Sequence, residues 1–304
     1  MNSNRKGFIL LLVVAVLISA AAVLALASLS VRLQARETGT SSDLAQISAA
    51  MDAVLARAVL GLEDNPPLYA DGRAYEFAIN GVQSTYRIIE TSGLIDLNGA
   101  SEALLAALFE RLGQSVPDAE TLAAAIADWR DGDDTPRGRG AERRAYRNAG
   151  LPGPGNRPFL HVSEVRGVLG MNAALYAAAA PYLTAGAGVK TPRALTAPPV
   201  VLDILDISTE KRRDILERRR TGRPPPGEDT APARDGKGKD KARTGGKGAR
   251  RYLLLIDAHR PGGARAARRM VFSTGPRPGS YAILSWQALP YGKARMLYDA
   301  DLGS

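Results

Sequence analysis

The sequence predicts an α+β protein in which a long N-terminal helix lies on a small antiparallel sheet, with an all-α block inserted between its strands. Apolar residues recur at intervals of three and four from residue 44 to residue 60, which is the spacing of one helix face. Asn80-Gly81 separates two extended stretches, which is a strong hairpin signal. Extended stretches return only after a long Ala- and Leu-rich block.

The N-terminal helix is expected to begin inside a membrane. Phe8 to Val31 is a run of 24 residues without a charge, preceded by a short leader that holds Arg5 and Lys6. At about 1.5 Å of rise per residue the run is roughly 36 Å long, which is enough to cross a hydrocarbon core of about 30 Å. The helical spacing then continues to about Gly61, where Asn65-Pro66-Pro67 stops it. The apolar positions of this second part are Leu44, Ile47, Met51, Val54, Leu55, Val59 and Leu60.

The remaining elements follow from local patterns. Extended stretches are predicted at 74–79, 84–90 and 94–97, and again at 251–258, 270–274, 281–287 and 294–298. Helices are predicted at 101–112, 118–128, 141–148, 162–183, 198–205 and 209–219. The late strands complete the sheet that begins before Ser101, so the helical block is an insertion within one domain.

Composition limits the chemistry. The 304 residues are 45% hydrophobic and include no Cys, which excludes disulfides, thiolate catalysis and zinc sites of the Cys type. Between Lys211 and Arg251 there are 15 Lys or Arg against 6 Asp or Glu, a surplus equal to the net charge of +9. Residues 224–247 are rich in Pro, Gly, Lys and Arg and are predicted to be a disordered loop.

Three interpretations of the N-terminus stay open on the residues alone. Ala25-Leu26-Ala27 offers a signal-peptide cleavage site, although the apolar run before it is long. A simple signal anchor also fits, because the leader is basic. In the third, the junction Lys6-Gly7-Phe8 resembles the cleavage site of type IV prepilins and type II secretion pseudopilins. That resemblance implies cleavage after Gly7 by the prepilin peptidase and methylation of Phe8.

Leu12 departs from the pilin pattern, because most pilins have Glu at this fifth mature position. The resemblance implies that the Glu pairs with the amine of the subunit ahead, and an unpaired carboxylate in hydrocarbon is costly. The absence of Glu therefore indicates a subunit with none ahead of it, at the tip of a filament, or a protein that is not a pilin.

Motifs spread along the chain resemble the K-type minor pseudopilin of type II secretion (general secretion pathway protein K). They are Gly93-Leu94-Ile95-Asp96-Leu97-Asn98, the acidic loop from Asp128 to Asp134 with Gly140-Ala141-Glu142 and Tyr146, Asn156-Arg157-Pro158-Phe159, Val162-Ser163-Glu164-Val165-Arg166 with Gly170, and Thr196-Ala197-Pro198-Pro199 with Leu202. The resemblance implies a pilin-like fold and a minor pseudopilin at the tip of the pseudopilus, which assists filament initiation and the export of folded proteins across the outer membrane.

The predicted organisation of the chain follows from these motifs and patterns. It comprises a leader (1–7), a transmembrane and filament helix (8–31), the pilin-like helix continuation with the first strands (32–98), a helical insert domain (99–220), a disordered basic loop (221–250) and C-terminal strands completing the pilin-like sheet (251–304). The expected location is the inner membrane, crossed once, with the C-terminal bulk in the periplasm. The partners implied are other minor pseudopilins, the prepilin peptidase and exported proteins.

The acidic loop is the one place where metal-binding chemistry is concentrated. Clustered carboxylates on a loop that contains Gly132 suit Ca²⁺, which takes six to eight oxygen ligands in flexible geometry. The alternative is a solvated loop neutralised by Arg130, Arg137 and Arg139. The family resemblance favours structural calcium, and the ligands it implies are Asp131, Asp133 and Glu142, with Asp134 as a ligand or a cap. Asp128 precedes the loop and is a candidate to end its helix.

The residues also bear on two other functions, DNA binding and catalysis. Glu164 to Asn172 resembles a helix-hairpin-helix, so the alternative is a membrane-anchored DNA-binding receptor, but Asn172 replaces the second Gly of the turn. The basic tract lacks the interleaved aromatic residues of a stacking surface, so nucleic acid is not an expected partner. His161 and His259 are interpreted as packing or surface residues and Trp129 and Trp286 as core or interface anchors. No catalytic motif was found, and an enzyme is not predicted.

Overall fold

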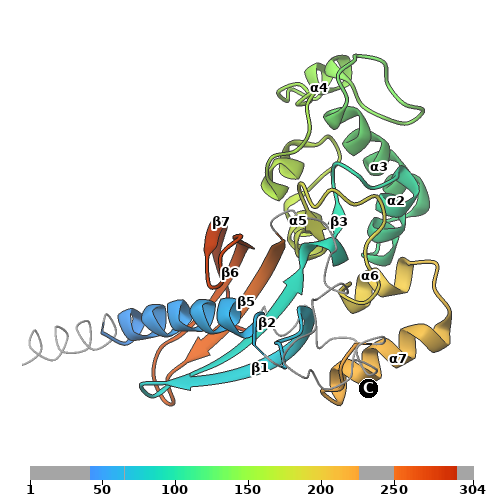
Figure 1. The fold of residues 1–304 in the computed structure, drawn as a ribbon. Helices are drawn as coiled ribbons and strands as arrows, with labels where there is room; N and C mark the ends of the chain where they lie inside the picture. Colours follow the sequence, from blue (N-terminus) through green and yellow to red (C-terminus); the bar gives the residue numbers. More distant parts are fainter. Residues whose placement is uncertain (1–41, 65, 226–249, 293–304) are drawn as a thin grey trace, which may run out of the picture.

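The computed structural model describes residues 42–64, 66–225 and 250–292, and it has the expected α+β architecture. A five-stranded antiparallel sheet lies beneath the N-terminal helix, whose described part is Ser42–Gly61 (Figure 1). The strands are β1 (Asp71–Ile79), β2 (Val82–Glu90), β5 (Arg251–His259), β6 (Arg265–Thr274) and β7 (Tyr281–Leu289), in the order β1-β2-β5-β6-β7. The late strands therefore complete the sheet that β1 and β2 begin, and the predicted fold class is confirmed. We call the helix and these five strands the sheet region.

One apolar layer holds the helix on the sheet. Ile47, Met51 and Val54 on the helix are at most 2% exposed, and they pack on side chains of β2, β5 and β6 such as Ile88, Leu254 and Phe272. The helix is long and apolar enough to cross a membrane, but 44% of its most apolar window is buried within the protein. The apolar face of this part of the helix is therefore packed against the sheet. The predicted membrane span at 8–31 lies outside the described residues.

The hairpin between β1 and β2 turns at Asn80-Gly81 as predicted. Asn80 has φ +49° and Gly81 has φ +75°, so both turn residues adopt the left-handed region. Two successive left-handed residues match the twist of a two-residue hairpin, which is why Asn-Gly is favoured there.

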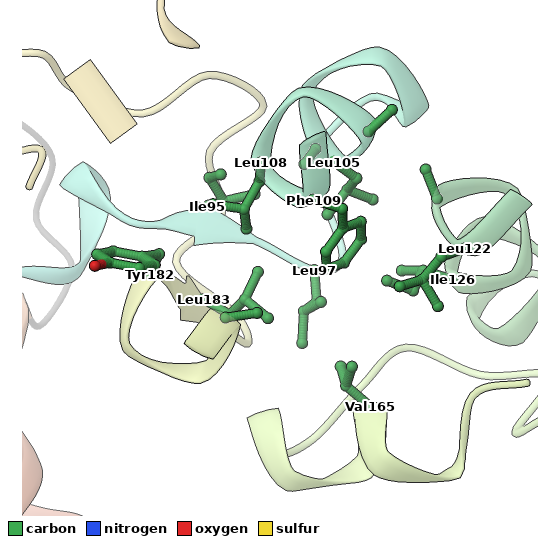
Figure 2. Close-up of a cluster of buried hydrophobic side chains, with 14 of the residues drawn as sticks. Ile95, Leu97, Leu105, Leu108, Phe109, Leu122, Ile126, Val165, Tyr182 and Leu183 are labelled. Atoms are coloured by element: carbon green, nitrogen blue, oxygen red, sulfur yellow. The ribbon is translucent and has the colours of Figure 1, made fainter. Parts of the chain in front are cut away.

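Between β2 and β5 the chain forms the helical insert (91–225). Its elements are η1 (Thr91–Gly93), β3 (Ile95–Asp96), α2 (Glu102–Arg111), α3 (Val116–Arg130), α4 (Arg143–Asn148), η2 (Val162–Gly167), α5 (Ala173–Ala179), η3 (Ala180–Tyr182), β4 (Leu183–Thr184), α6 (Pro199–Ile204) and α7 (Thr209–Arg220). Figure 2 shows its core, in which Phe109 and Leu105 of α2 meet Leu122 and Ile126 of α3. This core is separate from the layer under the N-terminal helix.

Two predicted elements were wrong. The single helix expected over 162–183 is divided into η2, α5, η3 and β4. Gly170 at φ +92° and Pro181 explain the breaks, since the first leaves the helical region and the second cannot donate to a helix. The stretch 94–97 does not join the main sheet, because Ile95 and Asp96 pair in parallel with β4. The strand expected at 294–298 and most of the basic loop lie outside the described residues.

Asp96 links β3 to the segment that follows β4. Its two carboxylate oxygens accept hydrogen bonds from the backbone N–H groups of Asn98 (3.0 Å), Gly186 (3.1 Å) and Gly188 (2.7 Å). Asn98 exchanges a pair of hydrogen bonds with the backbone of Phe159, at 2.8 and 2.9 Å. The polar residues of the Gly93–Asn98 motif thus hold together segments that are far apart in sequence.

Candidate metal centre

Three carboxylates converge in the loop between α3 and α4. Asp131 is the C-cap residue of α3 and Glu142 is the N-cap residue of α4, so the helix ends position both. One oxygen each of Asp131, Asp133 and Glu142 lie within 4.8 Å of one another. These are the three residues for which the family resemblance implied calcium ligation.

Glu142 is the buried member of the cluster. The residue is 5% exposed, and neither of its carboxylate oxygens has a hydrogen-bond partner. Burial, followed by repulsion from Asp128, Asp131, Asp134 and Asp133, raises the pKa of Glu142 to about 7. A buried carboxylate without a donor is costly, and a bound cation would remove that cost.

The two carboxylate oxygens of Asp131 have different surroundings. Its Oδ2 accepts a hydrogen bond from Arg137 Nε at 2.9 Å, whereas its Oδ1 is buried without a partner. Asp133 is exposed, and its Oδ1 accepts from Thr135 N at 2.8 Å. Asp134 is not part of the converging group. It lies 3.6 Å from Arg143 Nε, with 55% of its side chain exposed.

Asp128 organises the loop from within α3. It is fully buried and accepts hydrogen bonds from the backbone N–H of Arg137 at 3.3 Å. A Cβ on Gly140 would collide with its carboxylate, so glycine is required for this close approach. Burial raises the pKa of Asp128, with the backbone hydrogen bond from Arg137 acting against that rise. Its oxygens are used inside the protein, and α3 continues past it to Arg130.

The arginines expected to neutralise the loop are mostly engaged elsewhere. Arg130 donates to the backbone carbonyls of Leu97 and Ala100, and its pKa is lowered by burial. Arg139 forms an ion pair with Glu120 at 3.1 Å. Within the described residues, Arg137 alone of the three pairs with the cluster, through Asp131. The solvated-loop alternative therefore leaves Glu142 uncompensated.

Asn156 is a candidate ligand that the sequence reasoning missed. Its Nδ2 donates to the carbonyl of Asp133 at 3.2 Å, and its buried Oδ1 has no partner. This hydrogen bond brings Asn156, whose backbone is left-handed at φ +44°, to the loop from a distant segment. Trp129 supports this arrangement, because its ring stacks on Phe159 with centroids 5.8 Å apart. An Asn within the family-like motif was the one available signal. Gly7 and Phe8, the predicted processing site, lie outside the described residues.

Comparison with known proteins places the insert in context. Residues 79–188 match the family described as Type II secretion system (T2SS), protein K. The predicted resemblance to this family is confirmed. Curated type II secretion system K proteins match over short segments: 45% identity over 80 residues in Klebsiella pneumoniae and 42% over 72 residues in Dickeya chrysanthemi. These segments cover 26% and 24% of this chain, and 24% and 20% of the relatives.

A solved structure extends the likeness to most of the fold. The chain is similar to a chain in the crystal structure of the GspK-GspI-GspJ complex from the type 2 secretion system of enterotoxigenic Escherichia coli. The match has a TM-score of 0.52 at 17% identity and covers 80% of this chain and 94% of the other. At that identity the likeness establishes the fold, with a sheet region and a helical insert in one chain.

Proposed function

We propose that this protein is the K-type minor pseudopilin at the tip of a type II secretion pseudopilus, where it assists filament initiation and the export of folded proteins. The observation that carries the proposal is the match of residues 79–188 to the protein K family within a helix-on-sheet fold, since these residues comprise the β1–β2 hairpin turn, β2 and most of the helical insert. A filament subunit needs one end that packs among helices and one end that differs from its neighbours. The N-terminal helix and the helical insert supply these two parts.

The partners proposed are the other minor pseudopilins, since the similar solved chain comes from a complex named for three such components. The test is co-purification of the full chain in detergent with tagged companion minor pseudopilins of the same secretion system. We expect a stable complex, and we expect that deleting the gene abolishes export while re-expression restores it. Export that persists without the gene would contradict the proposal.

We further propose that the prepilin peptidase cleaves after Gly7, that Phe8 is methylated, and that the mature chain crosses the inner membrane once with its bulk in the periplasm. The support is the Lys6-Gly7-Phe8 junction and the uncharged run that follows. Mass spectrometry of the mature N-terminus tests it. Methylated Phe8 agrees with the proposal, whereas an N-terminus at Ser28 or intact Met1 indicates a signal peptide or a simple anchor.

The metal centre is proposed to bind Ca²⁺ as a structural ion held by Asp131, Asp133 and Glu142. The support is the pair of partnerless oxygens on Glu142, which sit among other carboxylates in the folded loop. Hard oxygen ligands on an irregular loop suit Ca²⁺ better than Mg²⁺, which requires strict octahedral geometry. The bound ion would supply charge compensation and fix the loop, and no catalytic role is proposed.

Titration calorimetry of the EDTA-treated full chain tests the calcium proposal. We expect Ca²⁺ binding that Glu142→Gln and Asp131→Asn each weaken at least tenfold, and that Glu110→Gln, at an exposed site on α2, leaves unchanged. Asp134→Asn distinguishes the two predicted roles of Asp134. If Asp134 is a calcium ligand, the substitution should weaken Ca²⁺ binding to a similar extent, and if Asp134 is a cap, the Ca²⁺ affinity should not change. Equal affinity of all variants would contradict the site.

The DNA-binding alternative has less support from the geometry. A helix-hairpin-helix needs two helices around its turn, but the first limb here is η2, a six-residue 3-10 segment. Asn172 occupies the turn position and caps α5, because its Oδ1 accepts from Leu175 N at 2.9 Å. Binding of the full chain to duplex DNA that falls steeply with salt would revive this alternative.

A further inference from the structure

A cavity of about 510 Å³ lies between the helical insert and the sheet, away from the metal centre. Strands β5, β6 and β7 form one wall, through Leu253, Val271 and the stretch 284–287, and the insert forms the other, through the stretch 160–163, Arg166 and Tyr176. These sheet residues lie on or beside the face opposite the N-terminal helix, where Leu253 and Leu255 are buried with Ile89 and Leu94. We call this cavity the inter-region groove.

The groove has a one-sided charge. Its described lining contains Arg166, Arg251, Arg269 and His161, and no acidic residue among those the structure describes. Arg166 and Arg251 are exposed. The guanidinium group of Arg166 lies over the ring of Tyr176, and that of Arg251 donates to the backbone carbonyls of Ala185 and Gly186, none of which carries a negative charge. Their positive charge therefore remains available to an anionic group in the groove.

The groove is also lined by large apolar side chains that are exposed to solvent. Leu160 is 65% exposed and Leu284 is 44% exposed, and both line it together with the ring of Tyr176. Exposed large apolar side chains beside uncompensated arginines are typical of a protein interaction site, in which aromatic and arginine residues contribute most of the binding energy. A small inorganic anion would use the arginines alone and leave these side chains uncovered.

From this combination we propose that the inter-region groove binds an acidic, extended peptide segment of another protein. Carboxylates of the segment meet Arg166 and Arg251, and its apolar side chains pack on Leu284 and Leu160. The proposal is independent of the filament role, since it concerns a surface that the metal centre and the N-terminal helix do not use.

The test uses the absence of cysteine from the chain, so that single-cysteine variants report on one place. Ser163→Cys and Ser285→Cys lie on opposite walls of the groove, and Thr209→Cys is an exposed control on α7. Each full-length variant in detergent is labelled with a maleimide, with and without the peptide acetyl-Asp-Leu-Asp-Tyr-Asp-amide. We expect this peptide to slow labelling at least threefold at both groove positions and to leave the control unchanged. The matched peptide with Lys in place of Asp should protect neither position.

Direct binding of the same peptides, measured by fluorescence anisotropy, gives the second readout. Arg166→Glu should weaken binding of the acidic peptide at least tenfold, and Arg213→Glu, at an exposed site on α7, less than twofold. The proposal is overturned by protection that does not depend on peptide charge, or by no binding at millimolar concentration. It is also overturned if a single-stranded oligonucleotide at equal ionic strength displaces the peptide at lower concentration. A chain shortened to end at Gly292 that binds at least tenfold more tightly would show that residues 293–304 compete for the groove, which overturns it as well.

Discussion

The sheet region and the helical insert bury similar kinds of side chains but hold them together differently. In the sheet region, a single helix face meets a single sheet face, and each strand is nine or ten residues long and pairs with its neighbours along most of its length. In the insert, short elements rich in Ala cannot fix one another in this way, and buried polar groups such as Asp96 and Asn98 join distant segments. The comparison indicates that the sheet region depends on apolar area and the insert on specific polar contacts as well.

The largest expected loss of stability comes from creating a cavity in either apolar core. Phe109→Ala in the insert and Phe272→Ala in the sheet region each remove a fully buried ring, and each should lower the free energy of unfolding of its own region by about 3–5 kcal/mol. Because the two cores are separate clusters, scanning calorimetry of the full chain should show each variant shifting a different transition. A single transition that both variants lower equally would show that the two regions unfold as one unit.

Asp96→Ala should produce the next largest effect and should be confined to the insert. The substitution leaves three backbone N–H groups without their acceptor in a place where Asp96 itself is 2% exposed. Loss of charge-assisted hydrogen bonds to buried donors is expected to cost about 2–4 kcal/mol. Chemical denaturation followed by near-ultraviolet circular dichroism measures it, with Asp206→Ala at an exposed position as the control. A loss below that of the control would show that apolar packing alone holds the insert.

The fold was more predictable than the site because the two depend on different kinds of pattern. The helix face from Ile47 to Val59 and the Asn80-Gly81 turn are local, and the sequence reasoning located both correctly. The break inside 162–183 was missed, since the Ala-rich composition favours helix and the tertiary pairing of β3 with β4 overrides it. β3 and β4 have only two residues each, so neither is long enough to show the alternating apolar pattern by which a strand is predicted.

In the metal centre, the clustered aspartates were visible as a short motif, and the family resemblance added Glu142. Glu142 is buried because α4, which begins at this residue, packs against the loop. No local pattern in the sequence indicates this burial. The contribution of Asn156 was missed for the same reason, because it reaches the loop from 23 residues beyond Asp133.

The pH dependence of stability should reveal the buried carboxylate of the insert. The folded-state pKa of Glu142, at about 7, lies above its ordinary value of 4.5, so the folded protein binds the extra proton. Stability from this group is therefore complete below pH 4.5 and is lost as the pH rises through about 7, by about 3 kcal/mol without a metal ion. Thermal unfolding in EDTA should show this fall, and Glu142→Gln should remove it.

Calcium should reverse the sign of that pH dependence. A bound Ca²⁺ favours the ionised carboxylates, so the unfolding temperature should rise rather than fall between pH 5 and pH 7.5 in excess Ca²⁺. Glu110→Gln serves as the control and should follow the unsubstituted protein under both conditions. The same pH dependence with and without Ca²⁺ would contradict a metal site at Glu142.

The smallest expected loss of stability comes from Gly→Ala, a substitution that can be made once in each region. Gly81, in the hairpin of the sheet region, has φ +75°, and Gly113, after α2 of the insert, has φ +92°. A Cβ would meet no atom closer than 4.0 Å at Gly81 and none within 4 Å at Gly113, so Gly→Ala adds backbone strain without a clash at either site. Each substitution should cost about 1 kcal/mol. If the regions are independent, Gly81→Ala lowers the transition that Phe272→Ala lowers, and Gly113→Ala lowers the one that Phe109→Ala lowers. Equal loss in both transitions from either variant would instead show that the two regions unfold as one unit.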